Sequence, residues 1–154
     1  MKSGIRHVQF TLGGHEVSLD IRVVRQSQHH TSAWSGGETT ELAIFPPQSR
    51  YAARDFGWRV SSATVTAKTS EFTRLPGYNR RLLLLAGELR LQSADGRETV
   101  LHPGEQYAFL GDTPITSFGL ATDFNLMLGA GWDGCITHVV LAPGDLHALT
   151  AQHI

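Results

Sequence analysis

Apolar residues recur at every second position through most of this 154-residue chain. Such alternation is typical of strands with one buried face, because successive side chains of a strand point to opposite sides. Clear examples are the segments HVQFTL (7–12), EVSLDIRVV (16–24) and GWRVSSATVTA (57–67). No segment combines a helical period with helix caps. The alternation therefore predicts an all-β domain, a barrel or a sandwich.

Turn residues divide the alternating segments. Gly13-Gly14 favours a tight turn, so we expect a β-hairpin from Val8 to Val24. The polar, glycine-bearing segment 25–41 is expected to be a functional loop. Further strands are expected around residues 42–45, 57–67, 81–92 (bent at Gly87), 99–101, 106–110, 115–120, 124–129 and 136–141.

One segment is echoed within the chain. VLHPGEQYAF, which starts at Val100, recurs as VLAPGDLHAL at Val140. The echo has two interpretations: shared Pro-Gly turn chemistry, or a duplicated barrel whose second copy is abbreviated. The second interpretation predicts that Pro103 and Pro143 lie in equivalent turns of two related sheets.

Composition excludes several classes of function. The net charge of −1 gives no broad basic face for nucleic acid. The single cysteine, Cys135, excludes an intramolecular disulfide and a cysteine-based zinc cluster. The first residues lack the apolar run of a signal peptide, and no segment is long and apolar enough to span a membrane. We therefore expect a soluble, cytoplasmic protein.

The first candidate for a binding site is the segment AWSGGETTEL (33–42). Its glycines, including Gly37, allow backbone N–H groups to approach a ligand, and its hydroxyls can form hydrogen bonds. We predict that Trp34, Gly37, Thr40 and Glu41 contribute to this rim. The alternative is a tight turn against which Trp34 packs.

Two later segments add charged and polar groups. Arg59 shares a strand face with Ala63 and Val65, which are expected to point to the core. A buried arginine needs an anion, either a protein carboxylate such as that of Glu41 or a ligand carboxylate, and both remain open. Asn125 shares a face with Asp123, either as a hydrogen-bonded pair or as a ligand contact.

LLLLAGELRL, the ADG turn, VLHPGEQYAF and the GDTP turn together resemble the core of a cupin barrel. Metal-binding cupins carry two histidines and a glutamate ahead of the central glycine, and a later histidine. Counted from Gly87, these places fall on residues that are poor metal ligands, namely Thr73 to Pro76, Arg80 and Ile115. We therefore predict neither a metal nor another cofactor.

Four segments in order resemble the HutD/Ves family: AWSGGETTELAIFP, FGWRVSSATV, FTRLPGYNRRLLLLAGELRL and FLGDTPITSFGLATDFNLM. They extend over residues 21–128. The resemblance implies a two-lobed cupin fold without the metal motif and without an established catalytic activity. HutD members are associated with bacterial histidine-utilisation gene clusters and are regarded as regulators that limit the pathway by sensing its formylated glutamate intermediate.

This chain departs from the family pattern in two places. Ser35 alone stands between Trp34 and Gly36, where the family carries lysine and asparagine. The chain also ends at Ile154, which is early for the second lobe of the family fold. We therefore expect residues 1–154 to form a single cupin-like domain with an incomplete second lobe.

The resemblance and the polar segments together predict a non-enzymatic, metabolite-sensing modulator of histidine utilisation. Its ligand is expected to be N-formylglutamate or a related carboxylate, held by Arg59 and by hydrogen bonds, with no catalytic residue. An alternative is a metal-independent cupin-type enzyme such as a sugar isomerase or epimerase, with Glu41 or His102 as general base. A third alternative is an assembly protein, because exposed barrel edges can pair into homodimers.

Overall fold

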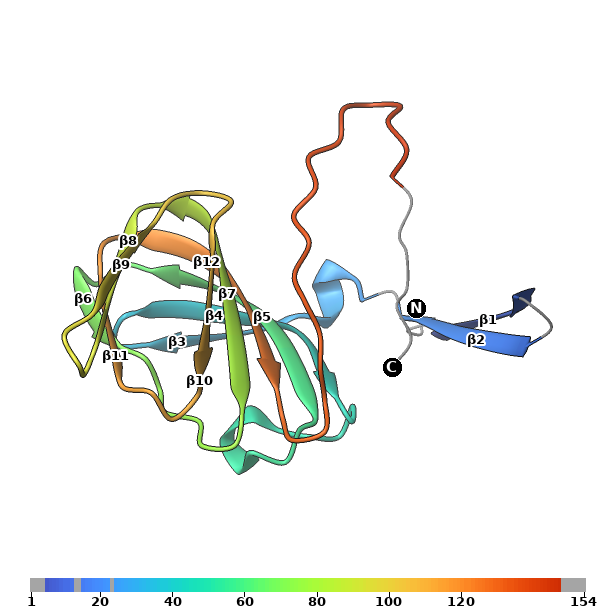
Figure 1. Ribbon diagram of the computed structural model, residues 1–154, viewed down its shortest axis with the longest axis horizontal. Helices are drawn as coiled ribbons and strands as arrows, with labels where there is room; N and C mark the ends of the chain where they lie inside the picture. The colour runs from blue at the N-terminus through green and yellow to red at the C-terminus, as the bar shows by residue number, and fades with distance from the viewer. Residues whose placement is uncertain (1–4, 13–14, 23, 148–154) are drawn as a thin grey trace.

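The computed structural model describes residues 5–12, 15–22 and 24–147, and almost every element in them is a strand (Figure 1). The larger sheet has the spatial order β10-β7-β12-β5-β4-β3. Its strands are β3 (His30–Trp34), β4 (Gly37–Phe45), β5 (Trp58–Val65), β7 (Asn79–Gly87), β10 (Gln106–Leu110) and β12 (Ala121–Leu128). The smaller sheet has the order β6-β11-β8-β9 and consists of β6 (Thr69–Glu71), β8 (Leu89–Ser93), β9 (Glu98–Leu101) and β11 (Ile115–Phe118).

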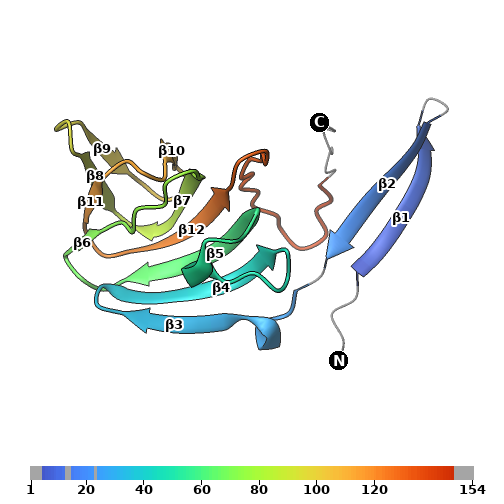
Figure 2. The same ribbon diagram turned by 90° about the horizontal axis from the view of Figure 1, so that it is seen from below.

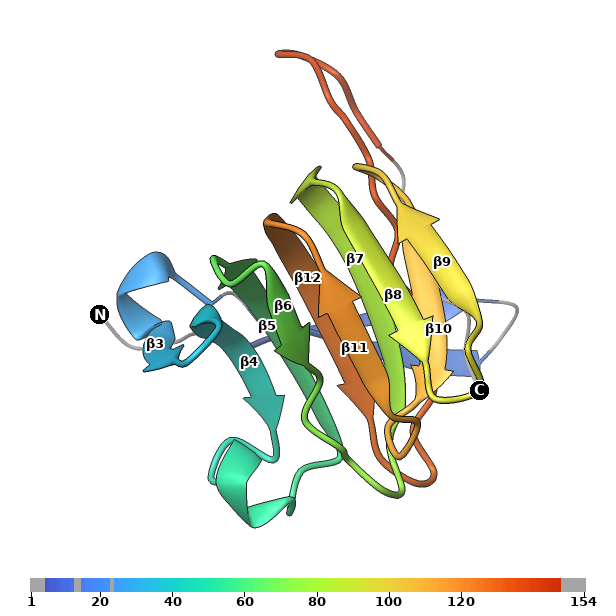
Figure 3. The same ribbon diagram turned by 90° about the vertical axis from the view of Figure 1, so that its left-hand side faces the viewer.

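The two sheets face each other and form a barrel. Figure 3 shows the strands of the smaller sheet in front of those of the larger one, with all pairs antiparallel. Two short 3-10 helices, η1 (Gln26–Gln28) and η2 (Tyr51–Ala53), lie in the connections. The predicted all-β architecture is confirmed. None of the helices in the described residues is long and apolar enough to cross a membrane.

The alternating sequence of β5 produces the inner face that it predicts. Arg59, Ser61, Ala63 and Val65 are all buried, whereas the residues between them are more exposed. The core of the barrel consists mainly of leucines from β7 and β8, with Leu82, Leu84 and Leu89 inaccessible to solvent. Burial of each such side chain contributes roughly 1.5–3 kcal/mol.

The segment 81–92 was predicted as one bent strand, but it forms two strands in different sheets. β7 ends at Gly87 and β8 begins at Leu89. Gly87 has a φ of 85°, and a Cβ atom there would lie 2.2 Å from the carbonyl oxygen of Leu120. Only glycine tolerates both the conformation and the close approach, so the chain turns at this position from one sheet to the other.

The segment 25–41 was predicted as a loop, and this prediction is wrong. It contains η1, β3 and the first part of β4, which pair as a hairpin from His30 opposite Glu41 to Trp34 opposite Gly37. β3 is an edge strand whose five residues are all exposed (Figure 2). Because neither face is buried, the strand carries no apolar alternation for a sequence to reveal.

The N-terminal hairpin is confirmed. β1 (Ile5–Leu12) and β2 (His15–Arg22) pair along their whole length and form a separate two-stranded sheet. The predicted Gly13-Gly14 turn lies outside the described residues. In Figure 1 the hairpin stands apart from the barrel.

The strand predicted over residues 136–141 is not formed, and residues 129–147 contain no strand. The two Pro-Gly turns nevertheless share their local geometry. Gly104 and Gly144 have φ values of 91° and 94°, and the N–H groups of Glu105 and Asp145 each donate to the carbonyl three residues earlier over 3.0 Å. The first turn connects β9 and β10, whereas residues 129–147 give the second no strand to connect. The echo therefore reflects turn chemistry, and the prediction of equivalent turns in related sheets is wrong. An incomplete second lobe stays a prediction.

Candidate ligand-binding site

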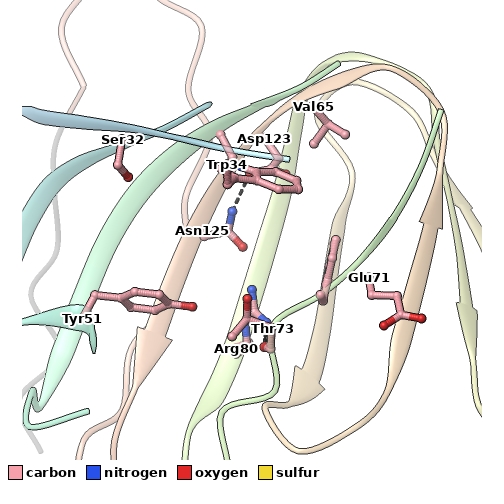
Figure 4. A pocket seen from close by; sticks show the side chains of 11 residues that line it. Ser32, Trp34, Tyr51, Val65, Glu71, Thr73, Arg80, Asp123 and Asn125 are labelled. Atoms are coloured by element: carbon pink, nitrogen blue, oxygen red, sulfur yellow. Dashed lines mark hydrogen bonds between the residues drawn. The ribbon is translucent and has the colours of Figure 1, made fainter. Parts of the chain in front are cut away.

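A cavity of about 230 Å³ lies inside the barrel (Figure 4). Four apolar or aromatic side chains form part of its wall: Trp34, Ala63, Val65 and Phe72. The remaining lining is polar and combines the buried Arg80, Asp123 and Asn125 with the half-buried Tyr51 and the exposed Ser32, Glu71 and Thr73. A small space with a few convergent polar groups in an apolar wall is typical of a small-molecule site.

Arg80 places a positive charge in this cavity. It lies on the inner face of β7, two residues before Leu82, and is only 6% exposed. Its Nη1 donates to the carbonyl oxygen of Thr73 over 3.1 Å, and its guanidinium lies 5.3 Å and 4.9 Å from the ring centres of Phe72 and Phe109. Its Nε is buried without a hydrogen-bond partner. Within the described residues, Arg80 has no carboxylate oxygen within 4 Å.

Burial disfavours the charged form of this guanidinium. It lowers the pKa of Arg80 below its usual range, and the positive charges of Arg59 and Arg54 lower it further, while Tyr51 and Asp123 act in the opposite direction. Arginine nevertheless keeps its proton in proteins. Arg80 is therefore a cation that is desolvated and only partly neutralised.

Asp123 and Asn125 face the cavity from the inner side of β12. Asn125 Nδ2 donates to Asp123 Oδ1, and Asn125 Oδ1 is buried without a partner in the described part of the chain. Burial raises the pKa of Asp123 to about 7, although the backbone of Ala63, the charge of Arg80 and the Asn125 amide all favour the carboxylate. Two residues of the cavity wall thus each carry a buried polar atom without a partner among the described residues, a donor on Arg80 and an acceptor on Asn125.

The sequence matches the HutD family over residues 26–152. The chain belongs to the HutD family. Two solved structures are similar to it: PA5104, a conserved protein of unknown function from Pseudomonas aeruginosa PAO1, and HutD from Pseudomonas fluorescens SBW25. Identity is 28% and 26%, the TM-score is 0.60 for both, and each match covers 70% of this chain. These matches cover 56% and 59% of the two relatives, so the chain spans less than two thirds of their length.

The fold extends beyond the family. Ectoine synthase from P. lautus is 12% identical, with a TM-score of 0.54 and coverage of 64% of this chain and 68% of that one. At 12% identity, the similarity shows a shared cupin-barrel fold and nothing about function. A shared fold alone does not imply a shared function.

Trp34 and Asn125, both predicted site residues, line the cavity of this HutD-family protein. Glu41 and Arg59 lie together but do not line it: Arg59 Nε donates to Glu41 Oε2 over 2.7 Å. Arg59 also donates from Nη1 to Ser61 Oγ over 3.0 Å. The protein itself therefore supplies the anion that the sequence required for Arg59.

Thr40 and Gly37 also lie away from the cavity lining. The hydroxyl of Thr40 is 2.8 Å from that of Thr31 across the β3–β4 hairpin. Gly37 lies where β4 approaches β5 so closely that a Cβ atom would be 1.9 Å from the carbonyl oxygen of Thr64. These contacts give both residues structural roles, and their contact with a ligand stays a prediction.

Sequence reasoning missed Arg80, Asp123 and Tyr51 as site residues. The signal for Arg80 was present, because alternation in NRRLLLLAG places it on the face of Leu82 and Leu84. Asp123 was assigned to the face of Asn125 but was left out of the site. Tyr51 comes from a connecting segment, η2, for which no periodic signal exists.

The described residues of this barrel contain no ligand set for a metal. Arg80 stands where sequence counting placed a metal-binding glutamate, and Leu75 and Ile115 are buried in the apolar core. In the described part of the chain, no group of three or more His, Cys, Asp or Glu residues could hold a metal ion. A cation in the cavity would oppose a divalent ion, so these residues do not fit a metal centre.

The general bases considered from the sequence also lie outside the cavity lining. Glu41 is paired with Arg59. His102 is exposed, with Nδ1 3.7 Å from Glu88 Oε2. Asp123 is the carboxyl group with a raised pKa that faces the cavity.

Proposed function

We propose that this HutD-family protein binds a small carboxylate in the barrel cavity and acts as a metabolite-sensing modulator of histidine utilisation. One observation carries the proposal: Arg80 is a buried cation in the cavity wall with no protein carboxylate oxygen within 4 Å among the described residues. A buried charge without a partner is costly, and a ligand anion would provide one. A guanidinium can also hold a carboxylate through two parallel hydrogen bonds.

The cavity suits a small acid that also carries a hydrogen-bond donor. Its volume of about 230 Å³ equals that of about eight water molecules at roughly 30 Å³ each. Asn125 Oδ1 can accept from an amide or hydroxyl group of the ligand. N-formylglutamate has both a carboxylate and an amide N–H, which supports it as a candidate. Formate is the simplest carboxylate to test, and the HutD structure from Pseudomonas fluorescens SBW25 is of a formate condition.

Titration calorimetry with formate, glutamate, N-formylglutamate and urocanate tests the proposal. Arg80→Gln removes the charge and keeps a polar side chain. Loss of a charge-assisted contact worth roughly 1.5–3 kcal/mol predicts a fall in affinity of about one to two decades. Arg59→Gln is the matched control, because Arg59 is equally buried but already paired with Glu41. We expect it to lower stability and to leave affinity unchanged.

Two results would contradict the proposal. One is the absence of binding by the wild type to all four acids. The other is equal affinity of the wild type and Arg80→Gln, each shown to be folded by thermal unfolding. The physiological part is tested separately: in the organism that encodes the protein, Arg80→Gln should change growth on histidine in the same way as deletion of the gene.

A metal-independent enzyme is a second candidate, supported by the position of Asp123. Its pKa of about 7 suits a general base, and Arg80 on the same cavity wall could stabilise an oxyanion. This pair could abstract a proton next to a carbonyl group. Hydrogen exchange of α-hydroxy and α-keto acids in D₂O, followed by NMR, would detect the reaction. Asp123→Asn should abolish exchange while binding persists, and absence of exchange with the wild type would eliminate this candidate.

A further inference from the structure

Trp34 has an unusual position at the end of β3. Its indole ring lies directly over Gly36, where a Cβ atom would be 1.9 Å from the ring atom Cζ3. Gly36 cannot easily retreat, since its carbonyl oxygen accepts hydrogen bonds from the backbone N–H groups of Thr66 and Ala67 over 2.8 Å and 3.1 Å. The ring thus occupies the space that a Cβ atom at position 36 would need, so its position depends on a glycine there.

The same ring borders two spaces. Trp34 lines the inner cavity with Arg80 and Asn125, and Figure 4 shows these side chains from close by. It also lines an adjoining open groove of about 530 Å³, whose wall includes Thr69, Ser70 and Thr116. Glu71 and Thr73 are the other two residues common to both spaces. These three shared residues form the partition between the cavity and the groove, and Trp34 is the largest of them.

The partition is not explained by packing in an aromatic cluster. Trp34 is 39% exposed, and within the described residues its ring stacks on no other aromatic side chain. Trp58 and Trp132, in contrast, both contact Phe45. A large ring that stands between two solvent-accessible spaces is suited to limiting what extends from one into the other.

We propose that Trp34 determines the specificity of the cavity for ligand length, by admitting short carboxylates and excluding acids whose chains would extend into the groove. The inference rests on the proposed carboxylate site at Arg80. A carboxylate held by Arg80 directs the rest of its chain into a space that the indole ring limits. Removal or displacement of the ring would join the cavity to the groove.

A homologous series of linear carboxylates tests this inference, with formate, acetate, hexanoate and decanoate as the probes. In the wild type we expect affinity to fall sharply beyond a certain chain length. In Trp34→Ala, decanoate should gain at least about tenfold relative to acetate, the discrimination that a size limit of one or a few methylenes provides. Gly36→Ala should have the same effect, since its Cβ displaces the ring without removing any atom that contacts the ligand.

The chain offers matched controls for both substitutions. Trp132 is 42% exposed and does not line the cavity, and a Cβ on Gly57 would be 2.5 Å from Trp132 Nε1. Trp132→Ala and Gly57→Ala therefore repeat the same changes away from the cavity, and they should keep the wild-type length limit.

The outcomes separate the inference from the proposed function. If the wild type binds acids and Trp34→Ala keeps its length limit, the inference is wrong and the carboxylate site stands. If only Trp34→Ala and Gly36→Ala bind acids, the ring closes the cavity to every acid, so both the length limit and ligand binding by the wild type are wrong. If none of these proteins binds any acid, both the site and the inference are wrong.

Discussion

Arg59 of β5 and Arg80 of β7 both pair with Met127, the residue of β12 that lies between them. The two buried guanidinium groups therefore extend from the same level of the larger sheet. Glu41 neutralises Arg59 through a 2.7 Å hydrogen bond, while Arg80 has no such partner among the described residues. Glu41 thus pairs with one of the two arginines, while burial of Asp123, the carboxyl group on the same cavity wall as Arg80, raises its pKa to about 7. This imbalance makes the barrel interior attractive to an anion.

Glu41→Gln should destabilise the protein, because it leaves Arg59 and Arg80 as two buried like charges. Loss of the charge-assisted hydrogen bond predicts a decrease in the free energy of unfolding of roughly 1.5–3 kcal/mol. Urea unfolding measures it. Glu38→Gln is the control on the same strand, since Glu38 is exposed. Equal midpoints for the two variants would show that the Arg59–Glu41 pair does not stabilise the fold.

Gly37→Ala should also lower stability, through steric conflict rather than charge. The added Cβ would lie 1.9 Å from the carbonyl oxygen of Thr64, which belongs to the backbone of the paired strand. Overpacking of this kind typically costs about 1–3 kcal/mol. Gly77→Ala provides the control, because Gly77 also has a positive φ but no atom within 4 Å of its Cβ position. An effect no larger than that of the control would contradict the predicted conflict.

Alternation predicted the strands that have one buried face, and it failed where that condition does not hold. β5 and the inward orientation of Arg59 were predicted correctly, because buried and exposed residues alternate along the whole strand. β3 was missed because both its faces are exposed. The opposite error occurred over residues 136–141, where alternating residues find no strand to pair with in the described chain. Alternation reports the side chains that a strand would present, but not whether a partner strand exists.

The candidate site was predicted only in part, for a related reason. Arg59 and Arg80 carry the same signal in sequence, an arginine on an apolar strand face. Glu41 decides which of the two arginines is paired with a carboxylate. Its position opposite Ser61 is set by the register between β4 and β5. This register includes a bulge between Glu41 and Ala43, so it could not be predicted from the spacing of residues in the sequence.

Purified protein should contain no stoichiometric transition metal. Thr73, Leu75, Pro76, Arg80 and Ile115 occupy the positions that supply ligands in metal-binding cupins, and none of them is a suitable donor. We therefore expect elemental analysis to find no equivalent of zinc, iron, manganese or nickel. Treatment with EDTA should leave the thermal unfolding midpoint unchanged. One bound equivalent of any of these metals would refute the prediction.

The stability of the protein should decrease as the pH rises from about 4 to about 7. Burial raises the pKa of Asp123 from 3.8 to about 7, so in this range the folded state holds a proton that the unfolded state has released. Stability falls wherever the folded state binds more protons. The shift corresponds to a loss on the order of 4 kcal/mol across the range. Asp123→Asn should remove this part of the slope, and urea unfolding at several pH values measures the difference between the two proteins. Identical slopes would mean that Asp123 does not titrate in this range.

Affinity for formate should decrease as the pH rises through 7, since ionised Asp123 and the bound carboxylate would compete for Arg80. Asp123 lines the same cavity, and its carboxylate form already gains from the charge of Arg80. By reciprocity, a bound anion should raise the pKa of Asp123 further, because binding and protonation favour each other. A coupling of one pKa unit would change affinity by about tenfold.

Calorimetric titration between pH 6 and pH 8 on the wild type and on Asp123→Asn tests this prediction, because this range brackets the pKa of about 7 of Asp123. The variant has a neutral side chain at every pH and should show constant affinity. A wild-type affinity that is equally constant would place the bound carboxylate beyond the reach of Asp123, and would therefore argue against Arg80 as its partner.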